Sequence, residues 1–213
     1  MTRRRESALL VAALLGSSPC LAAKLPAPGS YVLQRIQRAP DAALLDAGGN
    51  PARLSRFVTG AVTALTFFYS HCADPRGCPV AWSTFEEARK EAGADPLLKT
   101  KLRLVFVSLD PRRDGPAVLR LLQSTESDGV IPWVFLTSSS RAALAPLLRE
   151  MGQDVADDAS GALNHMLKVF LIDPDGWTRE IYSTAFLTPE NLLNDARTLA
   201  LEFPKADNEA KER

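Results

Sequence analysis

The chain has 213 residues, of which 46% are hydrophobic and 23% are charged, a composition typical of a globular protein that can bury one substantial core. Basic and acidic residues each number 25, and beyond the first few positions the basic ones are scattered along the chain. The sequence therefore predicts a single domain and excludes nucleic acid as a partner, because the basic patch that such binding requires is missing.

The first 23 residues have the layout of a secretory signal peptide. Arginines at 3–5 are followed by an apolar run at 8–16 and by small residues at 20–23 that suit cleavage. The apolar run is about half of the ~20 residues that a spanning helix needs. We therefore expect residues 1–23 to be cleaved, leaving an exported, periplasmic protein without a stable membrane span. The protein would be membrane-associated only if this segment were retained.

After a lead-in at 24–41, the chain alternates between turn signals and apolar runs. The turn residues at 46–51 favour a short hairpin. The continuous apolar run at 62–69 predicts a strand buried on both faces. A helix is expected over 80–91, where every third residue is apolar or small and Pro79 suits the first turn.

The second half of the chain continues this alternation. Residues 102–109 predict another buried strand, and a helix is expected around 117–123. A short strand follows at 133–137 and a helix at 141–151, with Gly152 as its stop. Strands that alternate with helices in this way indicate a parallel α/β sheet.

The last elements are a hairpin and a helix. Strands at 166–172 and 178–182 flank a tight turn at 173–176. The final helix runs from Pro189 to about Leu201 and has Thr188 as its cap.

This order of elements predicts the fold class. A βαβ unit followed by a hairpin and a terminal helix is the thioredoxin arrangement. We therefore expect an α/β fold with a central mixed sheet flanked by helices, an extra strand and helix inserted between the two halves, and a short N-terminal hairpin. The domain would cover 42–203, and the charged residues 204–213 would form a disordered tail.

Two cysteines remain after signal cleavage, because Cys20 leaves with the signal. Cys72 and Cys78 lie between a buried strand and the following helix, at the sheet edge where ligands usually bind. The helix terminus is expected to lower the pKa of Cys78 and to favour its thiolate. Such a pair can be a structural disulfide, a redox couple or a metal site.

The cysteine segment resembles the Sco/SenC family of copper-delivery proteins. The family motif reads roughly T-H-C-P-x-x-C-P after an apolar strand, and Ser70-His71-Cys72 and Cys78-Pro79 fit its two ends. The family places three residues between its cysteines, whereas this chain has five. Since three intervening residues correspond to about one helical turn, the longer spacing implies that Cys72 reaches the site from a loop.

Two later motifs extend this resemblance to residues 42–200. The D-P-x-x-D-x-P motif of the family matches Asp110, Pro111, Asp114 and Pro116. The H…Y-L-I-D-P-x-G motif matches His165 followed by residues 170–176.

The resemblance implies a function and a set of ligands. Cys72, Cys78 and His165 would bind copper; thiolates select Cu(I), and an added imidazole also accommodates Cu(II). The protein would help to assemble the copper centre of a respiratory oxidase, through transient contact with an oxidase subunit or another copper chaperone. Apart from the resemblance, His71 is a candidate for supporting the ligands or handling protons, and Asp110 and Asp114 could support the ligands, dock a partner, or cap a helix and form a turn.

Two alternatives remain open. The chain could be a thiol–disulfide oxidoreductase that reduces a partner through catalytic Cys72 and Cys78. The cis-proline usual in such enzymes is missing, because no proline occurs between Pro146 and Pro174. The chain could also be a binding module in which Cys72 and Cys78 form an inert, purely structural disulfide.

Overall fold

The protein is described by a computed structural model that covers residues 24–72, 74, 77–126, 129–157 and 163–203. The predicted signal peptide (1–23) and tail (204–213) lie outside these residues. Among the helices that are described, none is long and apolar enough to cross a membrane.

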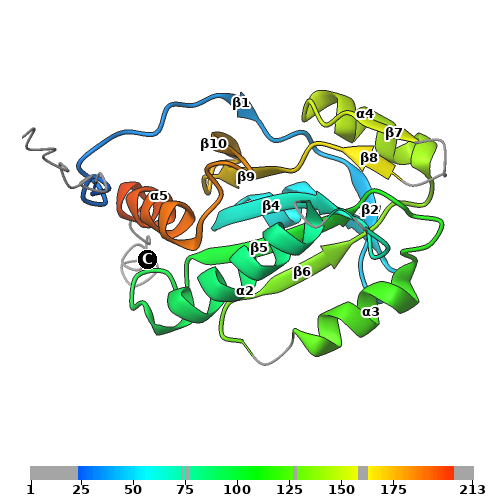
Figure 1. The fold of residues 1–213 in the computed structure, drawn as a ribbon, viewed down its shortest axis with the longest axis horizontal. Helices are drawn as coiled ribbons and strands as arrows, with labels where there is room; N and C mark the ends of the chain where they lie inside the picture. The colour runs from blue at the N-terminus through cyan, green and yellow to red at the C-terminus, as the bar shows by residue number, and fades with distance from the viewer. Residues whose placement is uncertain (1–23, 73, 75–76, 127–128, 158–162, 204–213) are drawn as a thin grey trace, which may run out of the picture.

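A six-stranded mixed sheet forms the centre of the described molecule (Figure 1). In sheet order its strands are β1 (Gln37–Arg38), β10 (Trp177–Ser183), β9 (Lys168–Ile172), β4 (Val62–Phe68), β5 (Leu102–Ser108) and β6 (Trp133–Leu136). Strands β4, β5 and β6 are parallel, whereas β9 is antiparallel to both β4 and β10. The predicted thioredoxin-like α/β fold with a mixed sheet is thus confirmed.

Strands β4 and β5 are buried because both faces of the sheet are covered. All seven residues of β4 are buried, and its register with β5 runs from Val62 opposite Leu102 to Phe68 opposite Ser108. Phe68 packs against Phe106 and Phe135, with ring centroids 5.4 and 5.9 Å away. A continuous apolar run therefore becomes a central strand, as expected for a strand without a solvent face.

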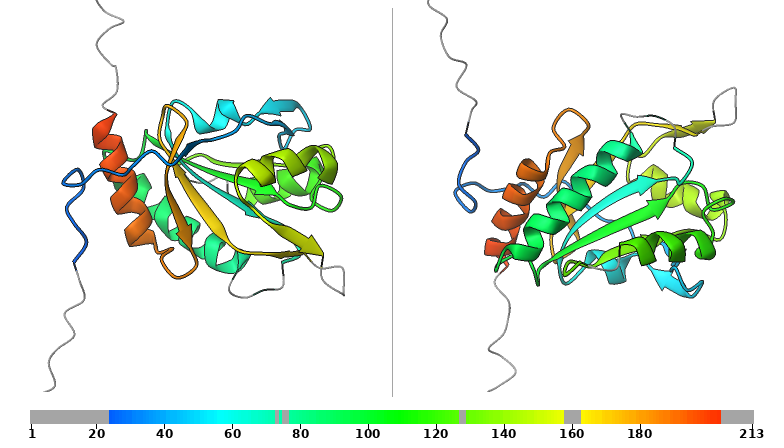
Figure 2. Two further views of the ribbon diagram at one scale, coloured as in Figure 1. Left: turned by 90° about the horizontal axis from the view of Figure 1, so that it is seen from above. Right: turned by 60° about the horizontal axis from the view of Figure 1, so that its bottom comes forward.

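Helices and a small hairpin cover the two faces of the sheet. Helices α2 (Cys78–Ala94) and α5 (Pro189–Glu202) pack together on one face. Helix α1 (Ser55–Val58) and the hairpin of β2 (Ala43–Leu45) and β3 (Pro51–Arg53) lie across the other face (Figure 2). The hairpin and the Thr188 cap of α5 were both predicted; the Thr188 hydroxyl accepts a hydrogen bond from the Asn191 amide at 3.1 Å.

The segment between β5 and β9 contains the main departure from the predicted elements. Helices α3 (Pro116–Thr125) and α4 (Arg141–Glu150) were expected, and Gly152 ends α4 with a positive φ of 61°. The unexpected element is a second hairpin, β7 (Val155–Asp157) paired with β8 (Leu163–His165). The prediction of one strand over 166–172 was wrong at its start, because His165 ends β8 and β9 begins only at Lys168.

The parallel strands leave their carboxyl ends at one edge of the sheet, on the right in Figure 1. The start of α2 and the end of β8 lie at the same edge. This arrangement brings two cysteines and one histidine together.

Candidate metal centre

The two cysteines lie on either side of the turn that joins β4 to α2. Cys72 lies in the loop, where its amide donates a hydrogen bond to the Tyr69 carbonyl at 3.2 Å. Cys78 is the first residue of α2, and Pro79 occupies the first helical turn, where a missing amide hydrogen costs nothing. Cys78 is buried and Cys72 half-buried. The expectation that Cys72 reaches the site from a loop is therefore confirmed.

His165 reaches the cysteines from β8. In the β7–β8 hairpin it is paired with Val155. Tyr69, just after β4, donates a hydrogen bond from its hydroxyl to the Leu163 carbonyl at 2.9 Å. The Tyr69 ring also packs edge-on against the imidazole, with centroids 5.8 Å apart. These two contacts hold β8, which carries His165, against the loop that carries Cys72.

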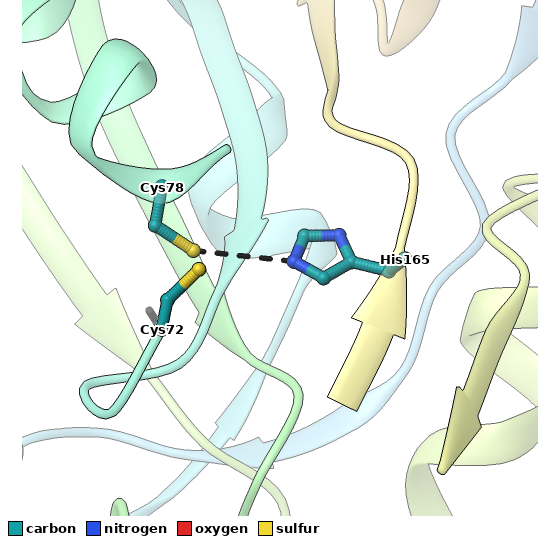
Figure 3. Close-up of side chains that lie close together, drawn as sticks. All are labelled: Cys72, Cys78 and His165. Carbon is teal, nitrogen blue, oxygen red and sulfur yellow. Dashed lines mark hydrogen bonds between the residues drawn. The ribbon is translucent and has the colours of Figure 1, made fainter. Parts of the chain in front are cut away.

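The structure brings the three expected ligands together. The two sulfur atoms and a ring nitrogen of His165 all lie within 4.8 Å of one another. The Cys78 Sγ is 3.9 Å from the His165 Nε2, and the imidazole points toward both sulfurs (Figure 3). Both thiols are free. One ion at the centre of this group could be bound by all three side chains.

The environment of Cys78 is dominated by burial. Burial raises the pKa of the Cys78 thiol to about 12, and the neighbouring Cys72 adds to this rise. The prediction that the helix terminus would lower this pKa was therefore wrong, because loss of solvent outweighs the helix dipole. In the metal-free protein Cys78 is a protonated thiol at neutral pH, and a metal ion must displace that proton to bind.

The His165 imidazole is prepared as a neutral ligand. Burial lowers its pKa below the ordinary value of 6.5, so the ring is uncharged at neutral pH. Its Nδ1 atom is buried and makes no hydrogen bond of normal geometry within the described residues. The Nε2 atom faces the sulfurs. A neutral ring that directs one nitrogen toward two thiols fits a soft metal ion.

Asp114 supports the cysteine loop, although it does not touch the sulfurs. Its fully buried carboxylate accepts hydrogen bonds from the Ser70 amide at 3.0 Å, the Ser70 hydroxyl, and the Ser108 hydroxyl at 2.7 Å. Ser70 lies two residues before Cys72. The carboxylate therefore fixes the point at which the loop that carries Cys72 leaves β4.

The other two expected supporting residues point elsewhere. Asp110 is buried and pairs with Arg113 at 3.2 Å. His71 is exposed, and its Nδ1 lies 2.8 Å from the Ser70 hydroxyl. Of the residues described, only Cys72, Cys78 and His165 form a group that could hold a metal. Asp110 and His71 are not part of it.

Sequence reasoning missed several residues that build the site. Tyr69 and Ser70 position the loop and the histidine strand, as described above. Gln153 is buried next to that strand and donates to the Met166 carbonyl at 2.9 Å, whereas its Oε1 has no partner within the described residues. The motif around Cys72 contains Tyr69 and Ser70, which was the available signal. No pattern in the sequence marks Gln153.

Comparisons with known proteins find a matching family. The family model described as SCO1/SenC matches residues 37–201. A comparison with curated protein sequences finds no match.

Three solved structures illustrate the similarity in fold. The first is a SCO1/SenC family lipoprotein from Bacillus anthracis, 20% identical, with a TM-score of 0.69 over 80% of this chain and 99% of that chain. The second is ScoI of Bradyrhizobium japonicum with copper bound, 23% identical, with a TM-score of 0.61 over 76% and 99%. The third is BsSco, described as a cytochrome c oxidase assembly protein with a disulfide switch, 18% identical, with a TM-score of 0.63 over 80% and 98%.

Proposed function

The chain belongs to the SCO1/SenC family, and on that premise we propose that it is an exported copper-binding protein that delivers copper to the assembling copper centre of a respiratory oxidase. The observation that carries this proposal is the convergence of two thiols and one imidazole within 4.8 Å. The copper bound in the ScoI relative and the oxidase-assembly role given for BsSco support it. Copper is the cargo here, held for transfer.

The donor set suits such a cargo. Two sulfurs and one imidazole nitrogen match the soft ligands that bind Cu(I), and the nitrogen also accommodates Cu(II). The ligands that hold copper must be deprotonated thiols and a neutral imidazole. The lowered pKa of His165 meets the second condition at neutral pH without a proton being removed.

The three ligands differ in how easily they can be exchanged. Cys78 is buried in the first turn of α2, and His165 is held at the end of a hairpin strand. Cys72 is half-buried on a loop between β4 and α2. We therefore propose that a partner's ligand displaces Cys72 first, while Cys78 and His165 still hold the ion.

The test compares two histidine variants of the reduced protein. Cu(I) is titrated anaerobically against a chromophoric competitor for the wild type, His165→Ala and His71→Ala. We expect one tightly bound ion in the wild type and at least about a 100-fold loss of affinity in His165→Ala, because a direct ligand is removed. His71→Ala is the matched control and should stay within about threefold. Equal affinities of His165→Ala and the wild type would exclude the imidazole from the site.

A second candidate function is thiol–disulfide exchange through the same two cysteines. It is favoured by the free state of both thiols, the closeness of their sulfur atoms, and the disulfide switch described for BsSco. The raised pKa of Cys78 opposes it, because the thiolate is the attacking form.

Redox titration of the metal-free protein separates the two functions. An oxidoreductase requires a Cys72–Cys78 disulfide that opens within roughly −120 to −270 mV, the range of known exchange proteins. Copper delivery does not depend on such a potential. If the bond opens in that range and the protein reduces a model disulfide, whereas it binds Cu(I) only weakly, thiol–disulfide exchange becomes the better assignment.

A further inference from the structure

A charged hollow of about 200 Å³ opens near the metal-binding group. We call it the arginine hollow. Its lining comes from the loop after β5, the start of α4, and the β7–β8 hairpin, and consists of Asp110, Arg112, Arg113, Arg141, Asp157 and Leu163. None of these residues is a ligand of the candidate metal centre.

The arginine hollow shares a strand with the metal centre. Leu163, which lines it, is the first residue of β8, and His165 is the last. The Leu163 carbonyl is bound by Tyr69, which precedes the cysteine loop. A molecule seated in the hollow would therefore lie against the strand that carries one copper ligand.

Among the described residues that line the hollow, the charges do not cancel. Asp110 is paired with Arg113 at 3.2 Å, and Asp157 with Arg141 at 2.9 Å. The remaining guanidinium, that of Arg112, is exposed and forms no ion pair within the described part of the chain. The whole chain has equal numbers of basic and acidic residues. The excess positive charge is therefore a local property of this hollow.

The chemistry of three guanidinium groups points to carboxylates as the ligand. Each guanidinium has five donors in a planar fork, so one that already binds an aspartate can donate to a second carboxylate. Arg141 also lies at the first position of α4, a ten-residue helix whose N-terminus adds partial positive charge. Carboxylates on a partner protein would meet both features.

We propose that the arginine hollow binds an acidic segment of the protein that exchanges copper with this chain. The proposal rests on the proposed function, because it assigns the docking surface for the same metal centre. Transfer requires the partner's ligand to reach Cys72 in a defined orientation. Paired carboxylates held by guanidinium forks fix such an orientation, and complementary charge raises the rate of encounter.

The test measures binding of an acidic peptide to the Cu(I)-loaded full chain. The probe is a fluorescently labelled octapeptide with four glutamates, and its partner peptide has glutamine at those positions. Fluorescence anisotropy is recorded at 20 and 150 mM NaCl for the wild type, Arg112→Glu and Arg120→Glu. Arg120→Glu is the matched control, an equal charge reversal at an exposed residue of α3 that does not line the hollow.

We expect the glutamate peptide to bind, the glutamine peptide not to bind, and the affinity to fall with salt. Arg112→Glu should weaken binding about tenfold at low salt, whereas Arg120→Glu should change it less than about twofold. Equal effects of the two reversals would overturn the proposal. Inorganic phosphate that displaces the peptide at an equal concentration would also overturn it, because the hollow would then be a site for small anions.

The failure of this proposal can be told apart from failure of the copper function. Cu(I) affinity is measured for Arg112→Glu by the same competition as for the histidine variants and should match the wild type. If copper binding is intact and the peptide does not bind, only the proposed docking surface is rejected. If the protein binds the peptide but does not bind Cu(I), the proposed copper function is rejected. A docking surface for copper exchange is then rejected with it.

Discussion

Two clusters of buried polar side chains in this molecule differ in how many of their atoms have hydrogen-bond partners. At the end of the sheet away from the cysteines, buried Arg179 donates to Asp173 and Glu202, each at 2.8 Å. Near the metal centre, the Nδ1 of His165 and the Oε1 of Gln153 are buried without partners in the described residues. An unsatisfied buried group costs about 1–3 kcal/mol. The Arg179 cluster therefore avoids this cost except at the neighbouring Thr178 hydroxyl, whereas the metal centre carries it at both of these atoms.

A second cluster of buried side chains with hydrogen-bond partners surrounds Asp195 of α5. The Asp195 carboxylate of α5 accepts hydrogen bonds from the hydroxyls of Tyr31 and Tyr182, the latter at 2.6 Å. Asn194 donates to the Tyr31 hydroxyl at 2.7 Å. Burial and the nearby carboxylate raise the pKa of Tyr182, which keeps it a hydrogen-bond donor. This cluster holds the lead-in segment against α5.

The largest expected effect is on stability, in the Arg179 cluster. Arg179→Ala leaves the fully buried Asp173 carboxylate without its ion-pair partner and should lower the free energy of unfolding by about 3–5 kcal/mol. Urea unfolding measures this loss. The matched control is Arg35→Ala, which removes an exposed pair with Asp175 and should cost less than about 1 kcal/mol. Similar losses in the two variants would contradict the comparison.

A smaller effect is expected at the metal centre, and on binding. Asp114→Asn replaces a buried acceptor of three hydrogen bonds and releases Ser70 at the base of the cysteine loop. Cu(I) affinity should fall about 10–100-fold, the usual effect of losing a group that orients ligands. Competition titration measures it. Asp110→Asn, whose carboxylate faces Arg113, should stay within about threefold. Equal losses would show that Asp114 does not act through the loop.

The smallest expected effect depends on pH. Burial raises the pKa of Asp95, but hydrogen bonds from Arg197 at 2.7 Å and from the Leu97 amide at 2.8 Å outweigh it and hold this pKa below its usual range. A carboxyl with a lowered folded pKa stabilises the protein above its unfolded pKa of about 3.9, and this contribution disappears as pH falls through the folded pKa.

Asp95→Asn should therefore cost about 1 kcal/mol at pH 7 and less below pH 4, as urea midpoints at the two pH values would show. The Cu(I) affinity of this variant at pH 7 should equal that of the wild type, because Asp95 lies at the far end of α2 from Cys78. A gap in stability that stays constant with pH would mean that the ionised carboxylate contributes nothing to folding.

The part of the fold that could be predicted is the part with strong local signals. The long apolar runs of β4 and β5 and the capped start of α5 are visible in the sequence because burial and capping determine those residue types. Strand β1 has only two residues, Gln37 and Arg38, and is a strand because it pairs with β10. The strands of the β7–β8 hairpin have three residues each, too few for a periodic pattern.

The candidate site could be predicted in its ligands but not in its surroundings. Cys72, Cys78 and His165 are residue types that metals select, and a family motif marks their order. Tyr69 and Gln153 are of ordinary types whose part depends on distant segments. The pKa of Cys78 was predicted in the wrong direction because a sequence shows the helix start but not how much solvent is excluded from the thiol.

The separation of the ligands along the chain has a consequence for when metal can be captured. His165 follows Cys78 by 87 residues, and bringing such distant residues together costs chain entropy that only folding repays. An unfolded chain offers an ion two nearby thiols and the adjacent His71 ring, but it does not bring the His165 imidazole to them. Binding by Cys72, Cys78 and His165 together therefore requires the folded domain, and a chain that has not yet folded lacks the third ligand of this site.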